Sequence, residues 1–185
     1  MLACLSSGWS QHSFILQSGL PLAYKEASMG SGFFIEANYF YSPDNRSGFG
    51  LGIKYLKSDL PNKGFVLTYD RLCTGLFALY NYRIKFSSNF SLLPSLELGY
   101  ALANGRMNQI NDINDEALGV QLGGDFNLVY GFTSKFEALI GIGFTHVFAK
   151  FDPHIDRIIP AVYSFGQDHV GSFYEFKVGL IYSIN

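Results

Sequence analysis

Hydrophobic and polar residues alternate along much of the chain with a period of two, which is the period of a β-strand. The clearest example is the segment 118–130. Its apolar parity reads Leu118, Val120, Leu122, Gly124, Phe126, Leu128 and Tyr130, and its other parity reads Gly119, Gln121, Gly123, Asp125, Asn127 and Val129. Such a segment predicts a strand with one apolar face and one polar face of small residues.

Segments of this kind follow one another along the whole chain, and the connections between them alternate in length. The eight segments lie at approximately 12–23, 31–41, 47–57, 70–86, 89–103, 116–131, 135–149 and 170–184. Tight turns fall at 42–46, 87–88 and 133–134, and longer links lie near 24–30, 58–69, 104–115 and 150–169. Short turns at one rim and long loops at the other are typical of outer-membrane barrels. We therefore predict an all-β fold, an eight-stranded antiparallel up-and-down transmembrane β-barrel with both termini on the short-turn side.

The polar parity indicates which face of the sheet is inside. It is rich in glycine, at positions 50, 52, 75, 99, 119, 123, 141, 143 and 179. Glycine weakens an exposed strand and is used where space is tight, so this parity fits a narrow lumen. Charged residues of both signs share it and can pair across the lumen. The expected polar network consists of Glu36, Lys54, Arg83, Glu97, Asp125, Glu137, Glu175 and Lys177.

The apolar parity changes character along the strands. Aromatic residues gather near the short turns (Tyr39, Tyr41, Phe49, Tyr82, Phe90, Tyr130, Tyr182) and toward the long loops (Tyr55, Tyr100, Phe144, Tyr174). Aliphatic residues such as Leu51, Leu98, Leu122 and Ile140 lie between them. Two aromatic girdles around an aliphatic band favour a barrel whose apolar face contacts lipid. The alternative is a soluble lipocalin-like lipid binder, whose apolar face would point inward.

Composition narrows the functional classes. Charged residues make up 15% of the chain and aromatic residues 17%. This is fewer charged residues than a protein with water on its whole surface usually has. The net charge of −2 gives no basic face for nucleic acid. The chain contains no run of 18 or more apolar residues, so the sequence does not predict a membrane-spanning helix.

The N-terminal segment reads differently from the strands. Residues 1–11 are expected to be the remainder of an export signal or a disordered N-terminus, and residues 12–185 the barrel domain. The two cysteines, Cys4 and Cys73, fall near opposite ends of the predicted barrel. We therefore expect both thiols to be free.

The last strand carries the motif polar, any, glycine, two of any kind, hydrophobic, any, hydrophobic, at Lys177, Gly179, Tyr182 and Ile184. With this motif and its strand pattern, the chain resembles the small outer-membrane barrels of the OmpA, OmpX, OmpW and opacity-protein type. Its last residue, Asn185, stands where many members have an aromatic residue. The resemblance implies a place in the bacterial outer membrane, contact with its lipids and lipopolysaccharide, and recognition by the barrel-assembly machinery.

Within that class we expect a monomer without a cofactor. Its role would be structural or interactive at the cell surface: adhesion, envelope integrity or passage of a small hydrophobic solute. A diffusion pore is disfavoured, because the lumen of eight strands is just wide enough for side chains.

An enzyme is the alternative within the same fold. The segment Gly143–His146 resembles the entry to the lipid A deacylase motif, in which a serine follows the histidine by two residues. Here that position is Phe148, and neither Thr145 nor Ser164 has the required spacing. We therefore expect no catalytic residues, with His146 as an amphipathic residue at the membrane interface.

Metal ligands could come from the long links. One set is Asp152, His154, Asp156, Asp168 and His169, and another is the run 111–116. The run lacks the glycine of a calcium-binding loop. We expect solvated surface loops and no metal site.

Overall fold

The computed structural model describes residues 11–23, 32–44, 46–61, 68–107, 114–149 and 171–184. Within these ranges no helix is long and apolar enough to cross a membrane. The strands are β1 (Gln11–Ala23), β2 (Gly32–Ser42), β3 (Ser47–Pro61), β4 (Thr68–Tyr82), β5 (Ile84–Lys85), β6 (Phe90–Met107), β7 (Asn114–Gly131), β8 (Phe136–Ala149) and β9 (Gly171–Ile184). Residues 1–10, including Cys4, lie outside the described residues.

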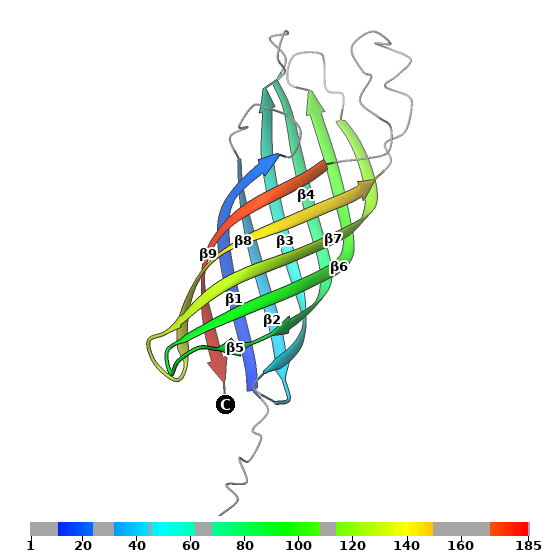
Figure 1. Cartoon of the computed structure of the whole chain (residues 1–185). Helices are drawn as coiled ribbons and strands as arrows, with labels where there is room; N and C mark the ends of the chain where they lie inside the picture. The colour runs from blue at the N-terminus through cyan, green and yellow to red at the C-terminus, as the bar shows by residue number, and fades with distance from the viewer. Residues whose placement is uncertain are drawn as a thin grey trace, which may run out of the picture.

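The strands form one closed antiparallel barrel (Figure 1). Consecutive strands pair, except that β4 and β5 do not pair with each other and both pair with β6; β1 pairs with β9 to close the wall. His12 at the start of β1 lies opposite Ile184 at the end of β9, so both strands reach the rim that carries the short turns. With β4 and β5 counted as one interrupted strand, the prediction of an eight-stranded up-and-down barrel is confirmed.

The predicted strand 70–86 is interrupted at Arg83. Pairing between β4 and β6 ends at Asn81 and resumes with β5 at Ile84, and Pro94 of β6 faces the interruption. Proline has no backbone N–H and cannot donate to a ladder of hydrogen bonds. On the other edge of the strand the β3–β4 register continues past the interruption, since the backbone N–H of Arg83 donates to the carbonyl oxygen of Arg46 at 2.6 Å.

The short turns are held by side-chain oxygens that accept backbone N–H groups. Asp44 Oδ1 accepts the N–H of Ser47 at 2.7 Å, and Ser87 Oγ accepts that of Phe90 at 3.1 Å. Thr133 repeats the arrangement in the third turn. In the first turn the backbone N–H groups of Ser47, the larger contributor, and of Arg46 lower the pKa of Asp44. Turn residues of this kind set tight connections.

The apolar parity faces outward around the whole barrel. Leu51 is 61% exposed and Leu98 59%, whereas Glu97 on the opposite parity is 3% exposed. Both predicted aromatic groups lie on this outer face, and aliphatic side chains lie between them. The lipocalin-like alternative is therefore wrong, because it requires the apolar parity to line the interior.

Some strands are longer on the loop side than their pattern predicts. Strands β6 and β7 have 18 residues each, and β3 and β4 have 15 each. A tilted transmembrane strand needs only about 9 to 11 residues. The loop-side ends of these four strands therefore extend beyond the length needed to cross a bilayer (Figure 1).

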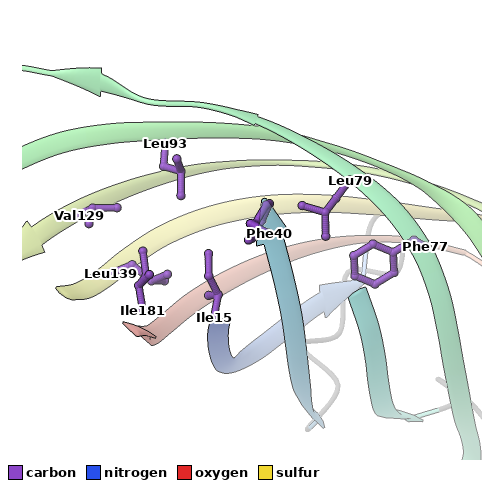
Figure 2. Close-up of a cluster of buried hydrophobic side chains, with 8 residues drawn as sticks. All are labelled: Ile15, Phe40, Phe77, Leu79, Leu93, Val129, Leu139 and Ile181. Carbon is purple, nitrogen blue, oxygen red and sulfur yellow. The ribbon is translucent and has the colours of Figure 1, made fainter. Parts of the chain in front are cut away.

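Apolar side chains fill parts of the lumen that glycines and charges were expected to fill. Toward the short turns lies the turn-side cluster, Ile15, Phe40, Phe77, Leu79, Leu93, Val129, Leu139 and Ile181 (Figure 2). Toward the long loops lies the loop-side cluster, Phe34, Leu56, Cys73, Ala101, Ala117, Val147 and Phe173. Cys73 is a free buried thiol, as expected. The charged side chains lie in a layer between the two clusters.

Candidate functional site

The charged layer gathers six ionisable side chains from five strands. They are Glu36 from β2, Lys54 from β3, Glu97 from β6, Asp125 from β7, and Glu175 and Lys177 from β9. All six are on the parity that faces the lumen, and their side chains are 0 to 4% exposed. Sequence reasoning predicted these residues as a network, and the structure brings them into contact.

Lys54 is the first cation of the layer. Its Nζ lies 3.0 Å from Glu36 Oε2, 3.2 Å from Glu97 Oε2 and 3.1 Å from Glu175 Oε2. It also donates to Thr145 Oγ1 at 3.0 Å. The ammonium group has three donors, so the carboxylates share its hydrogen bonds.

Lys177 is the second cation, and it interacts with the same three glutamates and with Asp125. Its Nζ contacts Asp125 Oδ1 directly and lies 3.0 Å from Glu175 Oε2. It lies 3.4 Å from Glu36 Oε2 and 3.8 Å from Glu97 Oε1. Each lysine therefore interacts with several carboxylates, and the layer behaves as one network.

Neutral groups complete the layer, and the sequence analysis did not single them out. The side-chain amides of Gln17 and Asn38 donate to Glu36 Oε1. The rings of Phe34 and Phe77 lie 5.8 and 5.7 Å from the Lys54 ammonium, within range of a cation–π interaction. Their inward parity was the available signal, since Phe34 and Asn38 lie two residues either side of Glu36 and share its face of β2.

The side chains of Asp125 and Lys177 lie so close to the backbone of β8 that only glycine fits at position 143. A Cβ on Gly143 would lie 2.3 Å from Asp125 Oδ1 and 2.7 Å from the Cε atom of Lys177. No side chain larger than hydrogen fits there without displacing the ion pair.

The remaining predicted pair, Arg83 and Glu137, lies apart from the layer at the short-turn rim. Both guanidinium terminal nitrogens donate to Glu137, at 2.6 and 2.8 Å. The side chains are 22% and 17% exposed. This ion pair is bidentate and neutral by itself.

Three carboxylates of the layer have the proximity that a metal site requires. Oxygen atoms of Glu36, Glu97 and Asp125 all lie within 4.8 Å of one another. The Lys177 ammonium, however, already contacts all three. The Lys177 ammonium therefore occupies the position that a metal ion would take. The candidate ligands in the link 150–169 lie outside the described residues.

His146 has a partner that spacing along the chain did not reveal. On the outward parity of β8, it lies opposite Ser172 of β9, and its Nδ1 is 2.6 Å from Ser172 Oγ. The rings of Phe144 and Phe148 flank the imidazole, with centroids 6.4 and 4.0 Å away. Sequence reasoning found His146 but looked for the hydroxyl on the same strand. The register of β8 with β9 was needed to find it.

The motif residues of the last strand divide between the two faces. Lys177 and Gly179 face the lumen, while Tyr182 and Ile184 are exposed on the outer wall. A Cβ on Gly179 would lie 2.6 Å from the carbonyl oxygen of Leu16 on β1. The glycine therefore lets β9 approach β1 closely where the barrel closes.

Comparison with known proteins identifies the fold. No family model matches the chain, and no curated protein matches it in sequence. Among solved structures, it is similar to a major outer membrane protein of Thermus thermophilus (TM-score 0.65, 12% identity, covering 95% of this chain and 100% of that one). It is also similar to Neisserial surface protein A (0.60, 14%, 95% and 97%). A third is Ail of Yersinia pestis in complex with a heparin analogue, sucrose octasulfate (0.52, 12%, 95% and 98%). The chain therefore has the fold of the small outer-membrane β-barrels.

Proposed function

We propose that the protein is an integral barrel of the bacterial outer membrane that presents its long loops at the cell surface for interaction. The observation that carries this proposal is the filled lumen: a buried charged layer between two apolar clusters. A barrel filled in this way supports a scaffold or anchor role, since eight strands leave room only for side chains.

Conductance tests the part of the proposal that concerns the lumen. The purified barrel, inserted into a planar lipid bilayer, is expected to give no steady ion conductance. A matched variant, Lys177→Ala with Asp125→Ala, removes side chains from the middle of the layer and is expected to raise conductance. Steady channels in the wild-type protein would refute the filled-lumen scaffold and favour solute passage.

The loop-side strand extensions support interaction at the surface. Strands β6 and β7 have 18 residues each, more than a tilted strand needs to cross a bilayer, so their loop-side ends reach beyond it. The links 24–31, 62–67, 108–113 and 150–170 together hold four basic and five acidic residues. They therefore have no excess of positive charge to attract a sulfated glycan. The similarity to Ail in its complex with sucrose octasulfate therefore does not extend to this ligand. A neutral or weakly charged partner, or lipopolysaccharide bridged by divalent ions, fits these links better.

Loop replacement tests the surface role. Each of the links 62–67, 108–113 and 150–170 is replaced by a short Gly-Ser turn, and the barrel is displayed on cells that lack native adhesins. Loss of attachment to host cells or of resistance to envelope stress, with unchanged barrel folding, is expected for at least one variant. Normal attachment and envelope integrity in all three variants would contradict the surface role.

The sequence of the last strand is the observation that supports recognition by the outer-membrane assembly machinery. Its outward residues Tyr182 and Ile184 and its Gly179 match the positions of the assembly motif. Replacing Tyr182 and Ile184 together by Ser is expected to lower the amount of barrel in outer-membrane fractions. The matched change at Tyr174 and Phe176, outside the motif, is expected to have a smaller effect.

A second candidate function, hydrolysis of a lipid ester at the loop-side interface, rests on the contact between His146 and Ser172. In this reaction Ser172 Oγ attacks the ester carbonyl, and its proton passes to the imidazole and then to the leaving alcohol oxygen. Water attacks the acyl-enzyme, and the fatty acid is released. Mass spectrometry of lipid A from cells with the wild-type protein, with Ser172→Ala and with His146→Ala tests this candidate. Identical spectra would exclude it, while acyl loss that requires both residues would support it.

A further inference from the structure

The charged layer contains more acidic than basic groups. The described side chains at this level include the carboxyl groups of Glu36, Glu97, Asp125 and Glu175 and the ammonium groups of Lys54 and Lys177. Strands β1, β4 and β8 contribute neutral groups, represented by Gln17, Phe77 and Thr145. With every group ionised, four negative charges would face two positive ones, which leaves a net charge of −2 inside the barrel.

Solvent does not screen this excess. The side chains of the layer are 0 to 4% exposed, and apolar clusters cover the layer on both sides along the barrel. The nearest further ion pair described, Arg83 with Glu137, is balanced within itself. An isolated charge in such surroundings is costly, and a buried carboxyl avoids that cost by remaining neutral.

The contacts identify which carboxyl is supported least as an anion. Glu36 accepts hydrogen bonds from two side-chain amides and contacts both ammonium groups, at 3.0 and 3.4 Å. Glu175 lies within 3.1 Å of both ammonium groups. Asp125 contacts Lys177 directly and accepts the hydroxyl of Ser95 at 3.1 Å.

Glu97 has weaker support than these three. It lies 3.2 Å from the Lys54 ammonium and 3.8 Å from that of Lys177. It also shares its surroundings with Glu36 and Asp125, whose oxygens lie within 4.8 Å. When carboxyl groups share a site, one of them tends to keep its proton.

We infer that the lumen of the folded barrel binds at least one proton at neutral pH, and that Glu97 holds it as a carboxylic acid. The site and its ligand are both internal to the barrel and do not depend on the surface partner. Because a free glutamate is ionised at neutral pH, folding takes up this proton from solution. The folded state then binds more protons than the unfolded state, so its stability falls as pH rises and the proton is lost.

A metal cation is the competing way to balance the layer. The three carboxylates that lie close enough to bind one are already in contact with the Lys177 ammonium. A metal ion would have to displace that ammonium, whereas a proton on Glu97 requires no movement of the lysine. The geometry therefore favours the proton, and the metal becomes an outcome of the test.

Infrared spectroscopy of the full chain, folded in detergent micelles at neutral pH, tests the inference. A protonated carboxyl gives a carbonyl stretching band above the amide I band, and an ionised carboxylate does not. The wild-type protein is expected to show this band and to lose it on alkaline titration together with part of its stability. Absence of the band at neutral pH overturns the inference, and retention of a divalent ion by the same sample would indicate the metal instead.

The variant Glu97→Gln assigns the proton to its residue. Glutamine has nearly the shape of a neutral glutamate, so the variant is expected to fold, to lack the band and to take up one proton fewer per chain on refolding. Glu137→Gln, at the rim ion pair, is the matched control and is expected to keep the band. A band that persists in a folded Glu97→Gln overturns the assignment. If that variant does not fold, Glu97→Asp is used, and an unshifted band in it has the same meaning.

Discussion

Arg83 and Glu137 form a bidentate ion pair across the short-turn rim, with nitrogen to oxygen distances of 2.6 and 2.8 Å. Arg83 reaches Glu137 from the interruption between the β4–β6 pairing, which ends at Asn81, and the β5–β6 pairing, which begins at Ile84. The interruption that weakens the ladder thus places a guanidinium where it can bridge to β8. Both side chains are less than a quarter exposed, so water screens the pair only in part.

A double-mutant cycle measures the strength of this rim ion pair. Arg83→Ala and Glu137→Ala are compared singly and together by urea-dependent unfolding in lipid vesicles. We expect a coupling energy of about 1 kcal/mol, toward the upper end for partly exposed ion pairs because the geometry is bidentate. Additive effects of the two substitutions would show that the pair contributes nothing to stability.

Removing one cation from the charged layer is expected to lower the free energy of unfolding by more than breaking the rim ion pair does. Lys177→Met leaves Asp125 and Glu175 without their shortest ammonium contacts. Loss of one partner from a buried ion pair typically costs about 3–5 kcal/mol. Adding Asp125→Asn to Lys177→Met restores the original charge balance, so the double variant is expected to regain part of the lost stability. If the double variant unfolds at lower urea than Lys177→Met, the excess of acidic groups does not govern the stability of the layer.

Gly19 tests how closely β1 and β9 approach at the closure of the barrel. A Cβ at this position would lie 1.7 Å from the carbonyl oxygen of Phe176, which is a backbone atom that can move only with its strand. Gly19→Ala is therefore expected to fold poorly and to lose heat-modifiable migration on gels. Gly131→Ala is the control, because the nearest atom to its added Cβ, Glu137 Oε1, would be 3.8 Å away. Equal folding of the two variants would contradict the close approach.

Arginine substitutions on the outer wall are expected to show which residues lie at the centre of the bilayer and which lie at its edge. Leu51 lies in the aliphatic band and is 61% exposed, while Phe86 lies in a short turn. Leu51→Arg is expected to cost about 2–4 kcal/mol in vesicles and a rim arginine about 0–1 kcal/mol. Phe86→Arg supplies the rim value. Equal costs at the two positions would mean that the band does not lie at the centre of a bilayer.

The sequence predicted the fold because its strongest signal, alternation of apolar and polar residues, determines which face of each strand is buried. The charged residues of the layer followed from their parity on the same strands. The apolar clusters did not follow. Phe34 and Phe40 share the inward parity of Glu36, but an apolar residue on the polar parity carries no sign of whether it fills the lumen.

Other features depended on distances between strands that the sequence does not contain. The interruption at Arg83 arises from Pro94 on the neighbouring strand, and it required the register of β4 with β6. The contact between His146 and Ser172 required the register of β8 with β9. The loop-side ends of β6 and β7, which reach Met107 and begin at Asn114, required the pairing of these two strands, because alternation alone placed the ends closer to the bilayer.

Nitroxide labels on the apolar outer wall of the barrel measure whether this wall faces lipid. A single cysteine replaces Leu98 in a background in which Cys4 and Cys73 are serine, and the labelled barrel is folded into lipid vesicles. The electron paramagnetic resonance signal is expected to be relaxed strongly by oxygen, which dissolves in lipid, and weakly by a polar nickel complex. A label at Phe86 should show the reverse. Strong relaxation of the Leu98 label by the nickel complex would mean that the wall faces water and that the barrel does not cross a membrane in this orientation.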